Sequence, residues 1–284
     1  MKISVVIPTL GGPSLIKLIK SLEKSYMLPN EVVCVISKKN NFTPLFSRKI
    51  KIKIIFTNFQ NQVLQRIEGI KNAKHDLILQ TDDDVIFDKY SLMHLYNALK
   101  KRNINTTIVG PVFFTRKKEL HYDYAKENFF TELIKFTFCA APLGKNKLGK
   151  VTSLGLAFNI NYSNKLYLYP SQWLPGGCIF YHKKNSILKF PIKYMGKSYS
   201  EDIIHSILRR KKNLHHFVVR NSKIITDKVS YNNFSIKQIL NEFVVRKSLL
   251  NYTKGNTFRF YIWCIFEIVN RIFRKLIFNK NKII

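Results

Sequence analysis

The sequence predicts an α/β fold with a mostly parallel central sheet and helices on both of its faces. Short β-branched segments alternate with segments of helical periodicity up to residue 101, which is the pattern of strand–helix–strand units. The strand segments are apolar almost without interruption, as expected of parallel strands covered on both faces. Hydrophobic residues make up 46% of the 284 residues, enough for a large core.

Four strands are predicted in the first part of the chain. Each is a short apolar run that a proline, a polar turn or a helical segment brings to an end. They cover Ile3–Ile7, Glu31–Ile36, Lys51–Phe56 and Asp76–Gln80.

Three helices are predicted between and after these strands. Leu15, Leu18 and Leu22 have helical spacing within Ser14–Ser25, and Pro29 lies beyond the end of that segment. The other two helices cover Gln62–Ala73, where Val63, Ile67 and Ile70 share one side, and Lys89–Lys101.

Three consecutive carboxylates, Asp82, Asp83 and Asp84, directly follow the fourth strand. Ligands of such sheets bind beyond the carboxyl ends of the strands. In an extended segment Asp82 and Asp84 point to the same side, and two carboxylates there suit Mg²⁺ or Mn²⁺ with positions left for substrate phosphates. The alternative is a solvated acidic turn that caps the following helix.

The second half of the chain has two further candidate segments. Gly176 and Gly177 precede a strand-like segment and permit unusual backbone angles or a close approach to a ligand. Trp173 beside them is either an acceptor-stacking residue or a core aromatic. Glu201 and Asp202 begin a helix, where they are either a capping pair behind Ser200 or a source of a catalytic base.

Three residues in the later part of the chain are candidates for a third metal ligand: His215, His216 and Asp227. Adjacent histidines in a strand face opposite ways, so at most one of the two points into a site. His205, on the helix after Asp202, is expected to be structural. The aromatic-rich segment 116–169 is a candidate for shaping an acceptor pocket.

The C-terminal segment Thr257–Phe278 is predicted to be an amphipathic helix. Phe258, Ile265 and Val269 fall on one face, and the basic residues, with Glu267, are expected on the opposite face. Such a helix suits the headgroup layer of an anionic bilayer, a packed position on the catalytic domain, or a dimer seam.

Composition narrows the class of protein. The 48 Lys and Arg against 17 Asp and Glu give a net charge of +31, which attracts nucleic acid, anionic membranes or phosphorylated small molecules. A compositional bias toward Lys, Asn, Ile and Phe is the alternative origin of this charge. Four separated cysteines argue against a zinc site and a disulfide scaffold. Neither a signal peptide nor a spanning helix is expected.

The order ISVVIPT, EVVCVI, QRIEGI and LILQTDDDV resembles the family 2 inverting glycosyltransferases of the GT-A fold, of the bacterial surface-glycan type. The resemblance is clearest over residues 1–110 and thinner to about 230. It implies that the acidic triplet holds a divalent metal, Mg²⁺ or Mn²⁺, and the ribose of a nucleotide-diphosphate sugar. By position, it implies metal ligation by Asp82 and Asp84, and donor contacts from these residues: Pro8, Thr9, Arg66, Asp82 and Asp83.

The same resemblance assigns the chemistry of the second half. It implies that Asp202 is the general base, with Glu201 as a supporting carboxylate and Gly176, Gly177 and Trp173 on the acceptor side. Ser37-Lys38 stands where the family often has an aspartate that contacts the nucleobase. The identity of the base is therefore left open.

We accordingly expect an inverting transferase that moves a sugar to a hydroxyl of a glycan or polyprenyl-linked glycan during polysaccharide biosynthesis. The alternatives are a sugar-1-phosphate nucleotidyltransferase and a basic nucleic-acid-binding protein. The dispersed lysines argue against nucleic acid as a partner. The expected organisation is a donor-binding half (1–110), an acceptor-binding half (111–230) and C-terminal helices (231–284). The expected location is cytoplasmic, peripheral on the inner face of the cell membrane.

Overall fold

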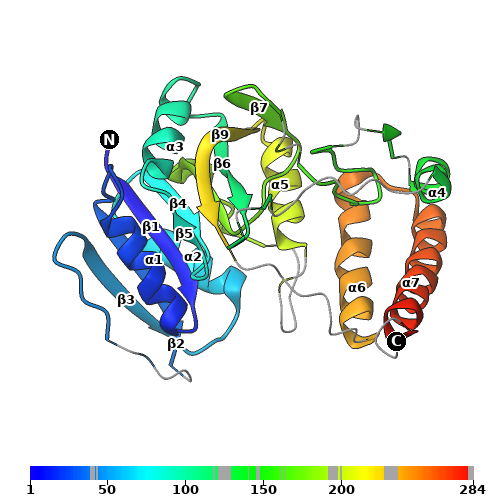
Figure 1. Ribbon diagram of the computed structural model, residues 1–284, viewed down its shortest axis with the longest axis horizontal. Helices are drawn as coiled ribbons and strands as arrows, with labels where there is room; N and C mark the ends of the chain where they lie inside the picture. Colours follow the sequence, from blue (N-terminus) through cyan, green and yellow to red (C-terminus); the bar gives the residue numbers. More distant parts are fainter. Residues whose placement is uncertain are drawn as a thin grey trace.

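The computed structural model describes the chain except residues 39–41, 43, 118, 121–128, 140, 145–147, 161, 163, 191–197, 199, 227–235 and 281–284. A large mixed sheet occupies one end of the molecule, and a group of helices occupies the other (Figure 1). This arrangement confirms the predicted α/β class.

In the described part of the chain, nine strands form the sheet in the order β3-β2-β1-β4-β8-β6-β9-β5, with β7 beside β9. The strands are β1 (Ile3–Thr9), β2 (Glu31–Ser37), β3 (Lys51–Thr57), β4 (Leu77–Thr81), β5 (Ile86–Phe87), β6 (Thr107–Phe114), β7 (Leu168–Ser171), β8 (Cys178–His182) and β9 (His215–Ile225).

The strands β3, β2, β1 and β4 run parallel, so their carboxyl ends meet at one edge. β8 runs antiparallel to β4 and places Cys178 opposite Thr81. The segment before β8 therefore begins where β4 ends. β3 departs from the expected coverage of both faces, because it is an edge strand whose Lys51 and Lys53 are exposed.

The helices agree with the predicted periodicity, and all predicted elements end within two residues of the observed ones. α2 packs against β1 and β2, and α3 packs against β6 and β9. The helices are α1 (Pro13–Glu23), α2 (Gln62–Asn72), α3 (Ser91–Lys100), α4 (Phe129–Cys139), α5 (Glu201–Lys211), α6 (Ile236–Thr253) and α7 (Thr257–Lys280), with a short 3₁₀ turn η2 (Lys183–Asn185).

Two hydrophobic clusters divide the core. The larger surrounds the sheet and includes Val6, Leu79 and Phe180. The smaller lies among α4, α6, α7 and the segment 154–158, and its members include Phe260 and Trp263. The helical end of the molecule thus draws part of its core from residues assigned by sequence to the acceptor-binding half. The domain boundaries stay a prediction.

The apolar row of α7 faces solvent, a direction that the amphipathic pattern alone left open. Glu267 and Arg271 form an ion pair at 2.6 Å, and Arg271 also reaches Glu242 of α6 at 3.1 Å. Arg271 therefore links α7 to α6, whereas the partner of Glu267 lies within α7 itself. The solvent side carries apolar residues instead, with Phe258 73% and Ile265 65% exposed. Among the described residues, no helix is long and apolar enough to cross a membrane.

Candidate active site

The acidic triplet after β4 lies in a turn rather than in an extended segment, so the reasoning that put Asp82 and Asp84 on one side is wrong in its premise. Asp82 is partly buried, whereas Asp84 is exposed. Asp82 Oδ1 accepts hydrogen bonds from Gln62 Nε2 at 2.9 Å and from Arg66 at 2.8 Å. Asp82 is therefore fixed from α2 and is not part of a solvated turn.

Arg66 joins the two halves of the chain. Its side chain is only 1% exposed, and its two terminal nitrogens donate to Asp82 Oδ1 and, at 2.5 Å, to Glu201 Oε1 at the start of α5. Burial alone would lower the pKa of Arg66, but Glu201 and Asp82 together raise it above its ordinary value. The guanidinium thus stays charged, and it brings the end of β4 and the start of α5 into one site.

The Gly176–Gly177 turn lies between these carboxylates. The carbonyl of Gly177 accepts from the Asp82 amide at 3.0 Å and from the Thr81 hydroxyl at 3.1 Å. A Cβ on Gly176 would approach Glu201 Oε1 to 2.6 Å, closer than any real contact. Only glycine allows this close approach. The antiparallel start of β8 therefore delivers the glycine pair to the acidic cluster.

Asp202 follows Glu201 and retains a partly exposed surface. Burial of its carboxyl and, second, the charge of Glu201 raise the pKa of Asp202 to about 7. Its Oδ1 accepts a hydrogen bond from the Ile203 amide at 2.9 Å. The capping role considered for Ser200 is not found, because Ser200 is left-handed (φ 55°) and its side chain makes no capping hydrogen bond.

The end of β1 forms the other wall. The Thr9 hydroxyl donates to Asp83 Oδ2 at 2.5 Å, and Gln65 Nε2 donates to the carbonyls of Thr9 and Val35. Pro8 is buried within β1, opposite Val35. Burial raises the pKa of Asp83, although the hydrogen bond from Thr9 lowers it. Pro8, Thr9 and Asp83 thus lie at one sheet edge with Asp82.

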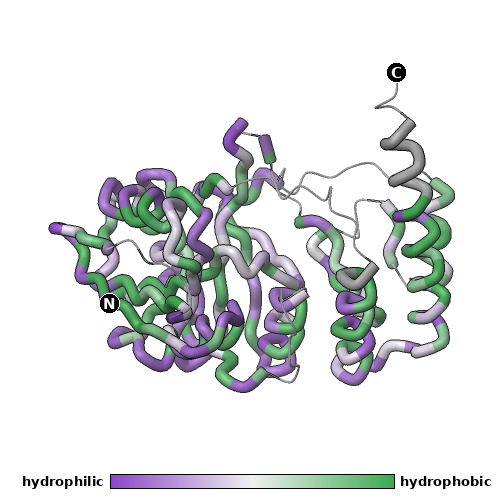
Figure 2. Tube along the Cα trace, turned by 90° about the horizontal axis from the view of Figure 1, so that it is seen from below, coloured by the Kyte–Doolittle hydropathy of each residue, from purple (hydrophilic) through white to green (hydrophobic). Residues whose placement is uncertain are grey.

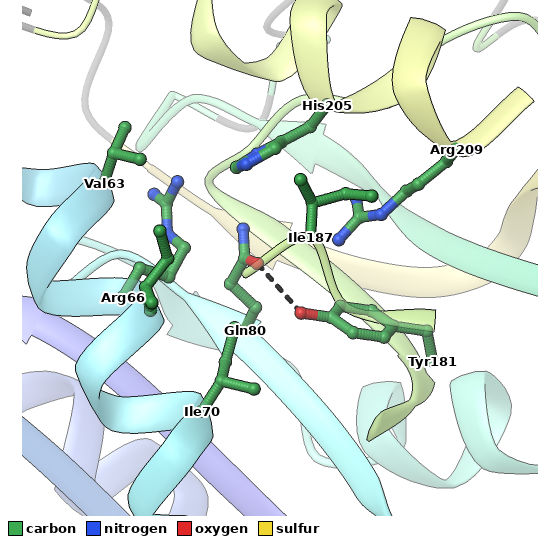
Figure 3. Close-up of a pocket in the computed structure, with 9 residues that line it drawn as sticks. Val63, Arg66, Ile70, Gln80, Tyr181, Ile187, His205 and Arg209 are labelled. Carbon is green, nitrogen blue, oxygen red and sulfur yellow. Dashed lines mark hydrogen bonds between the residues drawn. The ribbon is translucent and has the colours of Figure 1, made fainter. Parts of the chain in front are cut away.

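Behind Arg66, polar side chains from α2, β4, β8 and α5 pack together with apolar ones such as Val63 and Ile187 around a small space (Figure 3). The Tyr181 hydroxyl donates to Gln80 Oε1 at 3.1 Å, and Gln80 Nε2 donates to the Gly176 carbonyl at 3.3 Å. The Arg209 guanidinium lies 4.6 Å from the centre of the Tyr181 ring. This network links α5 and β8 to the glycine turn.

His205 belongs to the same buried network. Its Nδ1 lies 3.4 Å from Glu201 Oε2, and the Phe190 ring packs edge-on against it, with centroids 4.7 Å apart. Burial, and next the charges of Arg209 and Arg66, lower the pKa of His205 well below its ordinary value. The imidazole is therefore neutral, and it packs beside Glu201 without a hydrogen bond to it.

Trp173 lies in the core. Its side chain is 6% exposed, and its indole nitrogen donates to the Phe158 carbonyl at 2.8 Å. This placement favours the core alternative over a surface on which an acceptor sugar stacks. His216 is likewise buried while His215 is exposed, as alternation in a strand predicts. Asp227 lies outside the described residues.

The donor set of the triplet fits a hard divalent cation. Asp82 Oδ1 accepts the hydrogen bonds from Arg66 and Gln62. Asp82 Oδ2 lies beside Gly177, 3.4 Å from the position that a Cβ on Gly177 would take. Asp84 is exposed at the same turn. Among the described residues no group of three His, Cys, Asp or Glu side chains could hold a metal alone. Mg²⁺ is commonly held by one or two carboxylates and substrate phosphates, which is the site that these residues offer.

Sequence reasoning named the acidic residues and their common partner Arg66 but missed other residues of the network. Gln62, Gln65, Gln80 and Tyr181 were not singled out. Gln80 and Tyr181 sit within apolar strands and give no signal in the sequence. Arg66 shares the helical face of Val63 and Ile70, and a charge on an apolar face is a signal for a buried partner.

In open α/β sheets ligands bind beyond the carboxyl ends of the strands, which is where the acidic triplet lies. The chain matches the family described as "Glycosyl transferase family 2" over residues 4–165, and it belongs to that family. The match selects the glycosyltransferase class over the nucleotidyltransferase and nucleic-acid-binding alternatives. A similar protein is the uncharacterized glycosyltransferase YwdF of Bacillus subtilis (strain 168), 25% identical over 133 residues.

That match covers 45% of this chain and 50% of YwdF, so the chain aligns with half the length of this curated relative. Among solved structures, the S. aureus TarS 1–349 structure has a TM-score of 0.51 and 16% identity over 80% of this chain and 60% of that one. GalNAc-T7 with UDP, GalNAc and Mn²⁺ has a TM-score of 0.59 and 14% identity over 88% and 49%. These similarities show the GT-A fold.

Proposed function

We propose that this protein is an inverting glycosyltransferase that transfers a sugar from a nucleotide-diphosphate sugar to a hydroxyl of a glycan or polyprenyl-linked glycan, with Asp202 as general base. TarS has been solved with UDP-GlcNAc and GalNAc-T7 with UDP and Mn²⁺, which supports a nucleotide-sugar donor and a divalent metal here. A role in polysaccharide biosynthesis belongs to the same proposal.

One observation carries the proposal: Arg66 ties Asp82 to Glu201, so the triplet and the Glu201–Asp202 pair face the same site. These residues come from opposite halves of the chain. A merely structural acidic turn and a merely structural helix start have no need to meet, whereas a transferase needs a donor-side and an acceptor-side carboxylate together.

The proposed chemistry of Asp202 follows from its pKa of about 7. A carboxylate with a pKa near the working pH is a better proton acceptor than an ordinary one while remaining partly ionised. As the acceptor oxygen bonds to the anomeric carbon, Asp202 takes the hydroxyl proton. The bond from that carbon to the diphosphate oxygen breaks on the opposite face, which inverts the configuration.

The other residues hold the reactants. Arg66 is buried, so we assign it to positioning Asp82 and Glu201; its predicted contact with the diphosphate stays a prediction. Thr9 and Asp83 form the nucleotide side, and Gly176–Gly177 gives the acceptor close access. A divalent cation on Asp82 and Asp84 would supply Lewis-acid stabilisation of the diphosphate charge.

Asp202→Asn tests the proposal. We expect transfer to fall about 10²- to 10⁴-fold, the contribution of a general base. Thermal shifts produced by UDP, GDP and dTDP, each with and without Mn²⁺, should match those of the wild-type chain because the donor site is untouched. Asp88→Asn, at an exposed aspartate outside the site, is the matched control. Transfer by Asp202→Asn at the wild-type rate would show that another group is the base.

A further inference from the structure

The helical end of the molecule exposes an unusually apolar surface. Large apolar side chains that point to solvent form one row on α4 and one on α7, and α4 packs against α7. Figure 2 shows hydrophobic colouring along the helices at this end. We call the two rows together the apolar helical face: Phe129, Phe130, Leu133 and Phe136 on α4, and Phe258, Tyr261, Ile265, Val269 and Ile272 on α7.

α7 is apolar on two sides: Phe260 and Trp263 are buried in the smaller cluster, and a second apolar row faces solvent. Its Glu267 and Arg271 are paired with each other and with α6, while Ile265 and Val269 are 65% and 55% exposed. A water-facing helix normally buries its apolar stripe and exposes its charges. Exposed apolar area of this extent marks a surface that another phase or molecule covers.

The charge of the helical end indicates what covers the apolar helical face. The only two carboxylates of segment 236–280, Glu242 and Glu267, are neutralised by Arg246 and Arg271. Lys247 and Arg259 are exposed beside the apolar row, with Lys247 Nζ 5.3 Å from the centre of the Tyr261 ring. A second copy of a chain with net charge +31 would be repelled, whereas an anionic lipid surface would be attracted.

We propose that the apolar helical face inserts into the headgroup layer of an anionic bilayer, with Lys247 and Arg259 on the lipid phosphates. The face lies outside the active site. The binding is peripheral, since the side chains enter the interface while the α6–α7 ion pairs stay within the protein. This surface adds a docking mode to the proposed transferase and would hold it beside acceptors that are themselves lipid-linked.

The test is co-sedimentation of the full chain with phosphatidylglycerol-containing vesicles and with pure phosphatidylcholine vesicles. We expect binding to the anionic vesicles that salt weakens. The double variant Phe258→Ser, Ile265→Ser should lower the partition coefficient at least about tenfold, because each large apolar side chain contributes about a factor of ten. The matched control, Phe46→Ser with Leu166→Ser, changes two exposed apolar residues outside the face and should bind normally.

Depth is measured with Tyr261→Trp, whose added indole should be quenched by lipids brominated in their acyl chains. Tyr26→Trp, also exposed but on the sheet side, should not be quenched. Equal binding by the double variant and its control would overturn the proposal. So would a wild-type dimer that ignores vesicles and dissociates in the double variant. Nucleotide thermal shifts, unaffected by these changes, report separately on the proposed function.

Discussion

The raised pKa of Asp202 suits its proposed role as a base but lowers the free energy of unfolding at neutral pH. Its pKa is raised from 3.8 to about 7 in the folded protein. Below about pH 3.8 the carboxyl is protonated in both the folded and the unfolded protein, so it does not lower the free energy of unfolding. Between these values the unfolded chain loses the proton that the folded protein keeps, so folding stability falls as pH rises. Above pH 7 the full cost of ionising the buried carboxyl is present.

Asp202→Asn removes this cost and should therefore stabilise the protein while it slows transfer. We expect a gain of about 2–4 kcal/mol at pH 8 that shrinks toward zero near pH 4. Urea unfolding of both chains across this range measures it. A variant that is less stable at pH 8, or a gain that does not depend on pH, contradicts the raised pKa.

At this scale the chemistry of single residues could be predicted from the sequence better than their contacts. Asp82, Glu201 and Asp202 stand out because they belong to acidic runs at the end of a strand and the start of a helix. The pairing of Arg66 with Glu201 joins residues 135 positions apart, and no local pattern encodes it. Gln80 could not be predicted as a site residue, because the sequence does not distinguish it from a glutamine that only packs within an apolar strand.

At the scale of elements, the fit of α2 on the sheet depends on Gly69. A Cβ at this position would lie 2.5 Å from Val6 Cγ1 and 3.0 Å from Val35 Cγ2, both buried in the core. α2 carries Gln62, Gln65 and Arg66, so its distance from the sheet sets the positions of three site residues.

Gly69→Ala should therefore destabilise the fold by about 1–3 kcal/mol through overpacking, despite the better helix propensity of alanine. Gly12→Ala is the matched control, since its Cβ would meet nothing within 4 Å. Chemical denaturation measures both. If Gly69→Ala leaves the free energy of unfolding unchanged, α2 can move away from the sheet without cost.

Periodicity located the first strands and helices to within two residues, because apolar spacing reports burial directly. It did not predict that β8 lies antiparallel between β4 and β6. Spacing indicates that a strand exists but not its direction or partner. The side that the α7 apolar row faces was left open among three alternatives, since it depends on how α7 packs against α6.

At the scale of the whole molecule, the two hydrophobic clusters suggest two units of stability. The smaller is centred on Trp263, which is 4% exposed and packs edge-on against Phe243 with ring centroids 5.6 Å apart. The sheet has a larger cluster, to which α6 also contributes Val245 and Leu249. Local opening of the helical end should thus be possible while the sheet stays folded.

Trp263→Ala should cost the helical end about 3–5 kcal/mol. Amide hydrogen exchange is expected to accelerate in α6 and α7 while β1, β2 and β4 keep their protection. Tyr261→Ala, at an aromatic residue two positions away that is 46% exposed, should change little. Uniform acceleration across the sheet would show that the two clusters unfold together.

The buried position of Arg66 also governs the order in which a newly made chain can mature. During synthesis α2 leaves the ribosome long before α5. The Arg66 guanidinium therefore lacks its partner Glu201 while the intervening residues are still being added. Until then, closing α2 fully onto the sheet would trap a charge that lacks one of its two carboxylates. The candidate site is therefore among the last parts around the sheet to form, and nascent chains that stop short of residue 201 should be the forms most dependent on chaperones.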